Sequence, residues 1–242
     1  MSSVRSRPSP PFYKYNMFNN YYTKVTVVDN NFLTSEECQH NLMIVQSLKN
    51  NWQSSFKYPY LSFLPFPLYS ISDHKDYISN TKLYKDLMYQ NFKLTYEKLQ
   101  FKLSNLLNVE LFFHDDLNYP GFHISNGKSM DKPNFHRDGF PQFKSIFSNK
   151  ERFYFGNNIL SVVIPLSISS EDDGLLYRTK NLPESDRQRL IYDEFLPYKS
   201  GMLIIWDGNI QHSMKPFLVH TSNSRITLQC HIVMGKKSYI FW

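Results

Sequence analysis

Two histidines and one aspartate in this sequence have the residue types and the spacing of a metal site. The stretch NFHRDGF at 134–140 places His136 and Asp138 one residue apart, and His212 follows the apolar run GMLIIWDG much later in the chain. If NFHRDGF is extended, side chains i and i+2 project to the same face, about 7 Å apart along the backbone. Taken alone, the His-x-Asp pair allows three interpretations: an accident, a buried ion pair, or two thirds of a metal site.

An arginine and a threonine extend the pattern. Arg225 opens the run RITLQC, and Thr227 lies two positions later on the same face of a predicted strand. Two imidazoles and one carboxylate bind one face of an octahedral ferrous ion and leave three positions open. A 2-oxo acid can fill two of these positions and oxygen the third, while an arginine and a hydroxyl hold the distal carboxylate of the acid. Each of the five residues therefore has a chemical reason to be present.

Hydrophobic periodicity predicts the elements that must position these residues. The stretch at 23–30 alternates like a short strand, and Thr34 or Ser35 begins a predicted helix as its N-cap. Residues 80–108 carry apolar side chains at helical spacing, which predicts a long amphipathic helix. Pro, Ser and aromatic residues dominate 53–79, and we predict irregular structure there.

From about residue 109 the pattern changes to short strands separated by turns. The predicted strands are VELFFHD, GFHISN, NFHRDG, ILSVVIPLS, GLLYR, GMLIIWDG, QHSMKPFLV and SRITLQCHIVM. Two helices followed by about eight short strands indicate a helix-backed β-sandwich or barrel. The sequence contains no GxxxxGK[ST], GxSxG or GxGxxG motif, so neither a phosphate-binding loop nor a nucleophile elbow is predicted.

Composition indicates one large domain. The chain has 242 residues, 41% hydrophobic and 20% charged, which suffices for a sizeable core. Cys38 and Cys230 form no CxxC pair and fit a reducing compartment, so we expect a cytoplasmic protein. No stretch is apolar enough to span a membrane. The net charge of +6 is scattered, so we do not expect a nucleic-acid partner, and the oligomeric state is not indicated.

The C-terminal half resembles the Fe(II)- and 2-oxoglutarate-dependent dioxygenases, whose core is a double-stranded β-helix, or jelly roll. The matched positions are His136, Asp138 and His212 as metal ligands, and Arg225 and Thr227 as the co-substrate clamp. The segments ILSVVIPLSISSEDDGLLYR and YKSGMLIIWDGNIQHSMKP are similar to the family's strands around the ligands. One departure is that Gly174 stands alone where many relatives carry a glycine pair, which concerns a turn and not the chemistry.

The resemblance implies a mainly β jelly-roll core with flanking helices, and a hydroxylase that uses Fe(II), 2-oxoglutarate and O2. We divide the chain into a flexible tail at 1–22 and one oxygenase domain at 23–242, with helical support at 30–108 and the core at 109–242. Succinate and CO2 would be released. We expect a small polar metabolite, such as an amino acid, as substrate.

Four further residues are weaker candidates. His123 and Asn126 precede the His-x-Asp stretch, where relatives often place polar residues against the co-substrate. Arg178 is a candidate for the pocket mouth or a solvated strand end, and His231 for the substrate pocket or the core. Two other functions stay open, namely a metal-binding jelly-roll module that recognises a ligand without oxidation, and a protein or nucleic-acid oxygenase of the same family.

Overall fold

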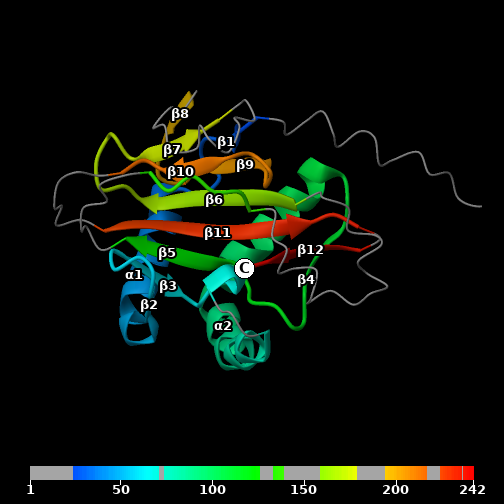
Figure 1. The fold of residues 1–242 in the computed structure, drawn as a ribbon. Coiled ribbons are helices and arrows are strands. Elements are labelled where there is room, and N and C mark those ends of the chain that lie inside the picture. Colours follow the sequence, from blue (N-terminus) through cyan, green and yellow to red (C-terminus); the bar gives the residue numbers. More distant parts are fainter. Residues whose placement is uncertain are drawn as a thin grey trace, which may run out of the picture.

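The computed structural model describes residues 24–70, 74–125, 133–138, 159–178, 194–216, 224–235 and 237–242. In this part of the chain, two α-helices accompany two β-sheets, and both helices lie on one side of the larger sheet (Figure 1). The prediction of a mainly β protein with flanking helices is confirmed. The predicted tail and Asn126 lie outside the described residues. Neither described helix has the length and apolar character needed to cross a membrane.

The larger sheet has the strand order β1-β9-β6-β11-β5-β3-β2, and its neighbours in this order are antiparallel. β12 pairs antiparallel with β11 and parallel with β4, and a smaller antiparallel sheet has the order β10-β7-β8. The bounds of the strands are β1 Thr26–Asp29, β2 Gln53–Ser54, β3 Leu61–Leu64, β4 Leu111–Phe113, β5 Gly121–Ser125, β6 Ile159–Ser167, β7 Gly174–Tyr177, β8 Glu194–Pro197, β9 Leu203–Asp207, β10 His212–Met214, β11 Arg225–Val233 and β12 Ser238–Phe241.

The two helices, α1 Ser35–Ser47 and α2 His74–Leu107, form where the sequence predicts helices, although α2 begins before the predicted start at residue 80. Thr34 caps α1 in a capping box, because its hydroxyl accepts from the Glu37 N–H at 3.2 Å and the Glu37 carboxylate accepts from the Thr34 N–H at 2.8 Å. In α2 the buried side chains recur at helical spacing: Met88, Phe92, Tyr96, Leu99 and Leu103. This stripe packs with α1 and one face of the larger sheet in a single hydrophobic core.

β11 separates that core from a polar interior. Ile226, Leu228, Cys230 and Ile232 belong to the core shared with the helices. Alternate residues of a strand project to opposite faces, so Arg225, Thr227, Gln229 and His231 share the other face. Nearly the whole strand is buried, so both faces are covered. The polar residues of β11 are therefore held inside the protein, on the face opposite the helices.

The prediction of irregular structure at 53–79 is wrong for part of that segment. The structure places β2, β3, a short 3-10 helix at Leu68–Ser70 and the start of α2 within it. β3 pairs with β5, with Phe63 opposite His123, and extends the larger sheet. The short strands escape detection because this pairing partner lies some sixty residues away in sequence, and proline and aromatic residues dominate the local pattern.

Three smaller differences concern strands. NFHRDG is not a ladder strand in its described part, because only an isolated bridge joins His136 to His212. β8 and β12 were not predicted, and each forms by pairing with a neighbour, β8 with β7 and β12 with β11. The other predicted strands are present in the described residues, several of them shorter than expected.

Gly201 is predicted to be essential for joining α1 to the sheet. Its backbone has φ +80°, and a Cβ at this position would lie 2.1 Å from the Leu33 carbonyl oxygen. Gly201 also accepts from the Leu33 N–H at 3.0 Å. Gly201→Ala should therefore lower the free energy of unfolding by about 2 kcal/mol or more, measured by urea denaturation. Ser200→Ala, an exposed neighbour, should stay within about 0.5 kcal/mol of the original protein, and equal values for the two variants would contradict this assignment.

Candidate metal centre

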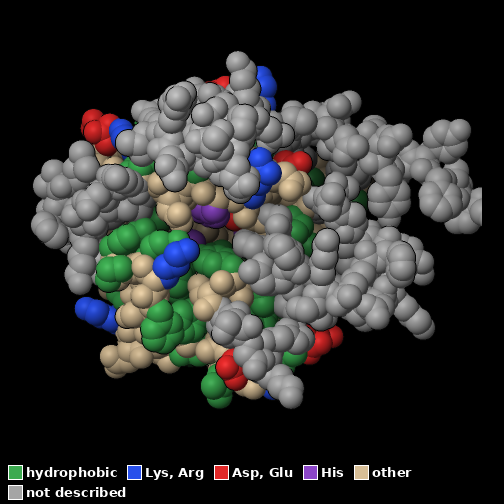
Figure 2. All heavy atoms as spheres, in the orientation of Figure 1, with side chains coloured by type: hydrophobic (Ala, Val, Ile, Leu, Met, Phe, Trp, Pro, Cys, Tyr) green, Lys and Arg blue, Asp and Glu red, His purple; other side chains and the backbone are tan. Residues whose placement is uncertain are grey.

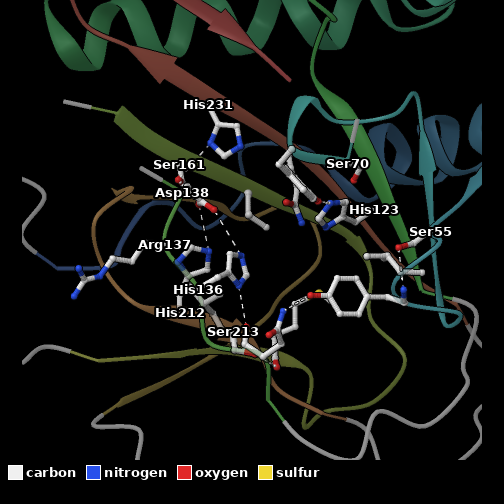
Figure 3. A pocket seen from close by; sticks show the side chains of 18 of the residues that line it. Ser55, Ser70, His123, His136, Arg137, Asp138, Ser161, His212, Ser213 and His231 are labelled. Atoms are coloured by element: carbon white, nitrogen blue, oxygen red, sulfur yellow. Dashed lines mark hydrogen bonds and ion pairs between the residues drawn. The ribbon is translucent and has the colours of Figure 1, made fainter. Parts of the chain in front are cut away.

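His136, Asp138 and His212 converge although they come from distant parts of the chain. The His136 N–H donates to the His212 carbonyl at 2.9 Å, and the His212 N–H donates to the His136 carbonyl at 3.0 Å. The Asp138 N–H donates to the Gly208 carbonyl at 2.8 Å, which fixes the other end of the same segment. One ligand atom from each of the three side chains lies within 4.8 Å of the others (Figure 3).

Backbone carbonyls orient both imidazoles. The Nδ1 atom of His136 lies 2.9 Å from the Asn134 oxygen, and the Nδ1 atom of His212 lies 2.9 Å from the Ile210 oxygen. A carbonyl only accepts, so each Nδ1 carries the proton and each Nε2 keeps a free lone pair. The Nε2 atoms of His136 and His212 lie 3.6 and 3.3 Å from the carboxylate oxygens of Asp138. This donor set, two imidazoles and one carboxylate, fits a ferrous ion.

The surroundings of Asp138 keep it ionised. Burial raises the pKa of this carboxyl, but His212, His231 and His136 and the hydrogen bond from Ser161 outweigh burial and lower the pKa to about 2. Burial lowers the pKa of His212 to about 4. At neutral pH the aspartate is therefore an anion and His212 is neutral, which are the states that bind a metal ion.

Ser161 contacts Asp138 directly, and His231 contacts Ser161 in turn. The Ser161 hydroxyl donates to Asp138 at 2.5 Å, and the His231 Nδ1 atom lies 3.4 Å from the same hydroxyl (Figure 3). His231 stacks against Trp242 with ring centroids 6.1 Å apart, and it also lines the cavity described below. Ser161 was not identified from the sequence, where it is one of two serines in the otherwise apolar strand ILSVVIPLS.

Arg178 lies beside the two ligand-bearing segments and not on the described cavity lining. The residue is buried, with 3% of its surface exposed. Its guanidinium carbon lies 4.0 Å from the centroid of the Phe135 ring, and Nη1 donates to the Gln211 side chain at 3.2 Å. Phe135 precedes His136 and Gln211 precedes His212. Arg178 therefore holds together the backbone segments that present both histidines.

A second polar cluster lies where β11 pairs with β5. Arg225 is opposite Ser125 and Thr227 is opposite His123, so the four side chains share one face of the sheet. Arg225 is buried, and its Nη1 lies 3.2 Å from the carboxylate of Asp173, which is also buried. The cluster places a buried cation among hydroxyl and imidazole groups. Ser125 was not identified from the sequence, because only the register of β5 against β11 brings it to Arg225.

Two buried atoms in this cluster have no hydrogen-bond partner within the described part of the chain: the Nδ1 atom of His123 and the hydroxyl of Ser125. The other ring nitrogen of His123 lies 2.5 Å from the Tyr69 hydroxyl. Burial lowers the pKa of His123 to about 3, so its ring is neutral. Buried polar atoms without partners cost free energy unless a ligand satisfies them. The pair is therefore suited to a polar ligand on the sheet face that β5 and β11 share.

A cavity of about 450 Å³ connects the ligands with this sheet face. Figure 2 shows histidine side chains at the floor of a hollow, with hydrophobic side chains along one side of it. The lining includes the three candidate ligands, His123, Ser161, Gln229 and His231, and aromatic side chains from 56–69. Its volume lies in the range of small-molecule sites in proteins.

The sequence matches no family model and no curated protein. Solved structures do share the fold. SnoN, a non-heme alpha ketoglutarate dependent epimerase from nogalamycin biosynthesis, is 13% identical in its complex with Fe3+, alpha ketoglutarate and nogalamycin RO, with a TM-score of 0.51 over 88% of this chain and 80% of that chain. AviO1 from Streptomyces viridochromogenes Tue57 is 10% identical, with a TM-score of 0.52 over 89% of this chain and 92% of that chain. The jelly-roll fold expected from the sequence is confirmed.

We expect Arg178 to control metal affinity without touching the metal. Arg178→Lys keeps the charge but loses the planar contact with Phe135 and the geometry of the bond to Gln211. The dissociation constant for Fe(II) or Co(II), measured by anaerobic titration, should rise about 10- to 100-fold, as for other residues that orient metal ligands. His212→Ala should abolish specific binding. Lys102→Met, which removes a cation that pairs with Asp29 at the surface, is the control and should bind the metal normally. Unchanged affinity in Arg178→Lys would show that the two segments hold their shape without it.

Proposed function

We propose that this protein is a non-haem Fe(II)- and 2-oxoglutarate-dependent oxygenase that hydroxylates an unactivated C–H bond of a small molecule and releases succinate and CO2. The observation that carries the proposal is the convergence of two Nε2 lone pairs and one ionised carboxylate on the wall of a cavity. The fold is also that of SnoN, which has been crystallised with Fe3+ and alpha ketoglutarate.

His136, Asp138 and His212 would hold the iron on one face and leave its other positions to exogenous ligands. The bound iron and the 2-oxo acid supply the oxidising chemistry, in which O2 is consumed and the acid loses CO2. The chain contributes ligand orientation. Backbone carbonyls fix both imidazoles, and Ser161 fixes one oxygen of Asp138 by its 2.5 Å hydrogen bond. Preorganised ligands cost no rearrangement when the metal arrives.

The cluster between β5 and β11 would hold the distal carboxylate of 2-oxoglutarate. Arg225 supplies the cation, and Thr227, Ser125 and His123 are its neighbours across the two strands. The unpartnered Ser125 hydroxyl is a donor that a carboxylate would satisfy, and the His123 Nδ1 atom is a second one in the tautomer in which the Tyr69 hydroxyl donates to Nε2. Asp173 contacts Nη1 of Arg225, and Nη2 donates at 3.3 Å to the sulfur of Met214, a residue of the cavity lining. Both contacts hold the guanidinium in one orientation.

The same cluster favours an oxygenase over a module that binds a metal and a ligand without oxidation. Burying an arginine costs free energy that a structural role does not require, since an apolar pair of similar volume is often as stable. A dicarboxylate co-substrate would give the buried Arg225 a task in a cluster whose His123 lines the cavity.

The reaction can be tested directly. Anaerobic protein loaded with Fe(II) should develop a weak visible charge-transfer band when 2-oxoglutarate is added. Exposure to O2 should then release succinate, measured by mass spectrometry, slowly without substrate and faster with it. His136→Ala should lose both signals. A protein that binds Fe(II) tightly but develops no band and no succinate would support the non-oxidising module.

Arg225→Lys tests the clamp. The change keeps the charge but loses the fork geometry, so it should weaken 2-oxoglutarate binding by about 1.5–3 kcal/mol. Thr227→Val should cost about 1 kcal/mol on the same scale. Binding is measured by titration of the metal-loaded protein with 2-oxoglutarate, and Thr26→Val on β1 serves as the matched control. If Arg225→Lys binds 2-oxoglutarate as tightly as the original protein, another cation holds the distal carboxylate.

A further inference from the structure

We propose that the segment from Ser55 to Ser70 is a substrate-binding wall that selects flat, ring-bearing molecules that are neutral or anionic and discriminates against amines. The inference rests on the proposed function in one respect, since it assigns the cavity beside the metal ligands to the substrate. It concerns the part of the cavity that neither the ligands nor the Arg225 cluster occupies.

The wall is aromatic. Phe56, Tyr58, Tyr60, Phe66 and Tyr69 all line the cavity, and all come from the two segments that flank β3. The rings of Tyr58 and Tyr60 lie 5.8 Å apart between centroids. Phe56 borders the cavity and yet is 97% exposed, so its ring packs little against the described part of the chain. Stacked and edge-to-face contacts with such rings favour a flat, apolar ring system in the ligand.

Among the described residues of the lining, the charged side chains are positive apart from the candidate metal ligand Asp138. Lys57 and Arg137 belong to the described lining, and its one carboxylate is Asp138. The Lys57 ammonium lies 5.2 Å from the centroid of the Tyr58 ring, at the edge of the aromatic wall. An ammonium group on a substrate would find no free carboxylate on these residues and would be repelled by Lys57. This class differs from the amino acid expected from the sequence.

One residue connects the wall with the candidate metal centre. The Asn134 side chain donates to the Tyr58 hydroxyl at 2.7 Å, and the Asn134 carbonyl oxygen lies 2.9 Å from Nδ1 of His136. The bond to Tyr58 thus fixes the residue that orients a metal ligand. A ring stacked on this wall would therefore be held at a defined position relative to His136, which an oxygenase needs in order to select one C–H bond.

Three probes with the same ring and different charge test the proposal: 2-naphthalenemethanol, 2-naphthoate and 2-naphthylmethylammonium. Their dissociation constants are measured by calorimetry on the metal-free protein, so the result does not depend on turnover. We expect the alcohol and the carboxylate to bind at least tenfold more tightly than the ammonium compound. Excess 2-oxoglutarate should not displace 2-naphthalenemethanol. This result would show that the alcohol binds at the aromatic wall and not at the cluster of Arg225, Thr227, Ser125 and His123.

Variants decide whether the wall is responsible. Phe56→Ala should weaken binding of 2-naphthalenemethanol at least fivefold. Phe101→Ala, the same change at an exposed ring of α2 outside the cavity lining, should leave that binding unchanged. Lys57→Glu should reverse the preference between carboxylate and ammonium. Equal binding of all three probes, tighter binding of the ammonium compound, or no effect of Phe56→Ala would overturn the proposal. Binding as expected without succinate release in the turnover assay would leave the wall in place and remove only the oxygenase function.

Discussion

The backbone bridge between His136 and His212 is the interaction on which the site depends. Two N–H···O bonds, of 2.9 and 3.0 Å, join a short segment to the start of β10. These bonds bring both imidazoles to the same point, with ring centroids 4.4 Å apart. Because the carbonyls of Asn134 and Ile210 also orient the rings, the backbone sets the direction of both Nε2 atoms. Surrounding side chains such as Arg178 hold that arrangement in place.

The arrangement of the candidate metal ligands requires polar groups in the protein interior. Asp138, Ser161, His231, Arg225 and Asp173 are all less than a tenth exposed. Such groups are tolerated because they are satisfied by one another, as in the pairs of Ser161 with Asp138 and of Arg225 with Asp173. The opposite face of β11 is apolar and packs against the helices. That packing provides hydrophobic stabilisation, which offsets the cost of burying the polar face.

Different parts of the chain carry the candidate metal ligands and the aromatic side of the cavity. The strands of the jelly roll and the bridge carry the candidate metal ligands and the Arg225 cluster, whereas β2, β3 and the residues around them extend the larger sheet and supply the aromatic side of the cavity. The ligand chemistry follows from a few residues with strict spacing. The aromatic side of the cavity depends on which faces of β2, β3 and their flanking segments point toward the cavity. The presence of aromatic residues in the sequence does not by itself specify that orientation.

The sequence by itself determined the helices, most strands and the identities of the three candidate ligands, because period and residue type are local properties. His-x-Asp, a distant histidine and Arg-x-Thr can be recognised without knowing their contacts. Tertiary structure decided the rest. The pairing of β3 with β5 formed strands where composition predicts none, and the register of β5 against β11 brought Ser125 to Arg225. The same applies to Arg178, for which the sequence left open the pocket mouth or a solvated strand end, and which lies buried against Phe135 and Gln211. Such contacts join residues far apart in the chain, and no local pattern encodes which of them will meet.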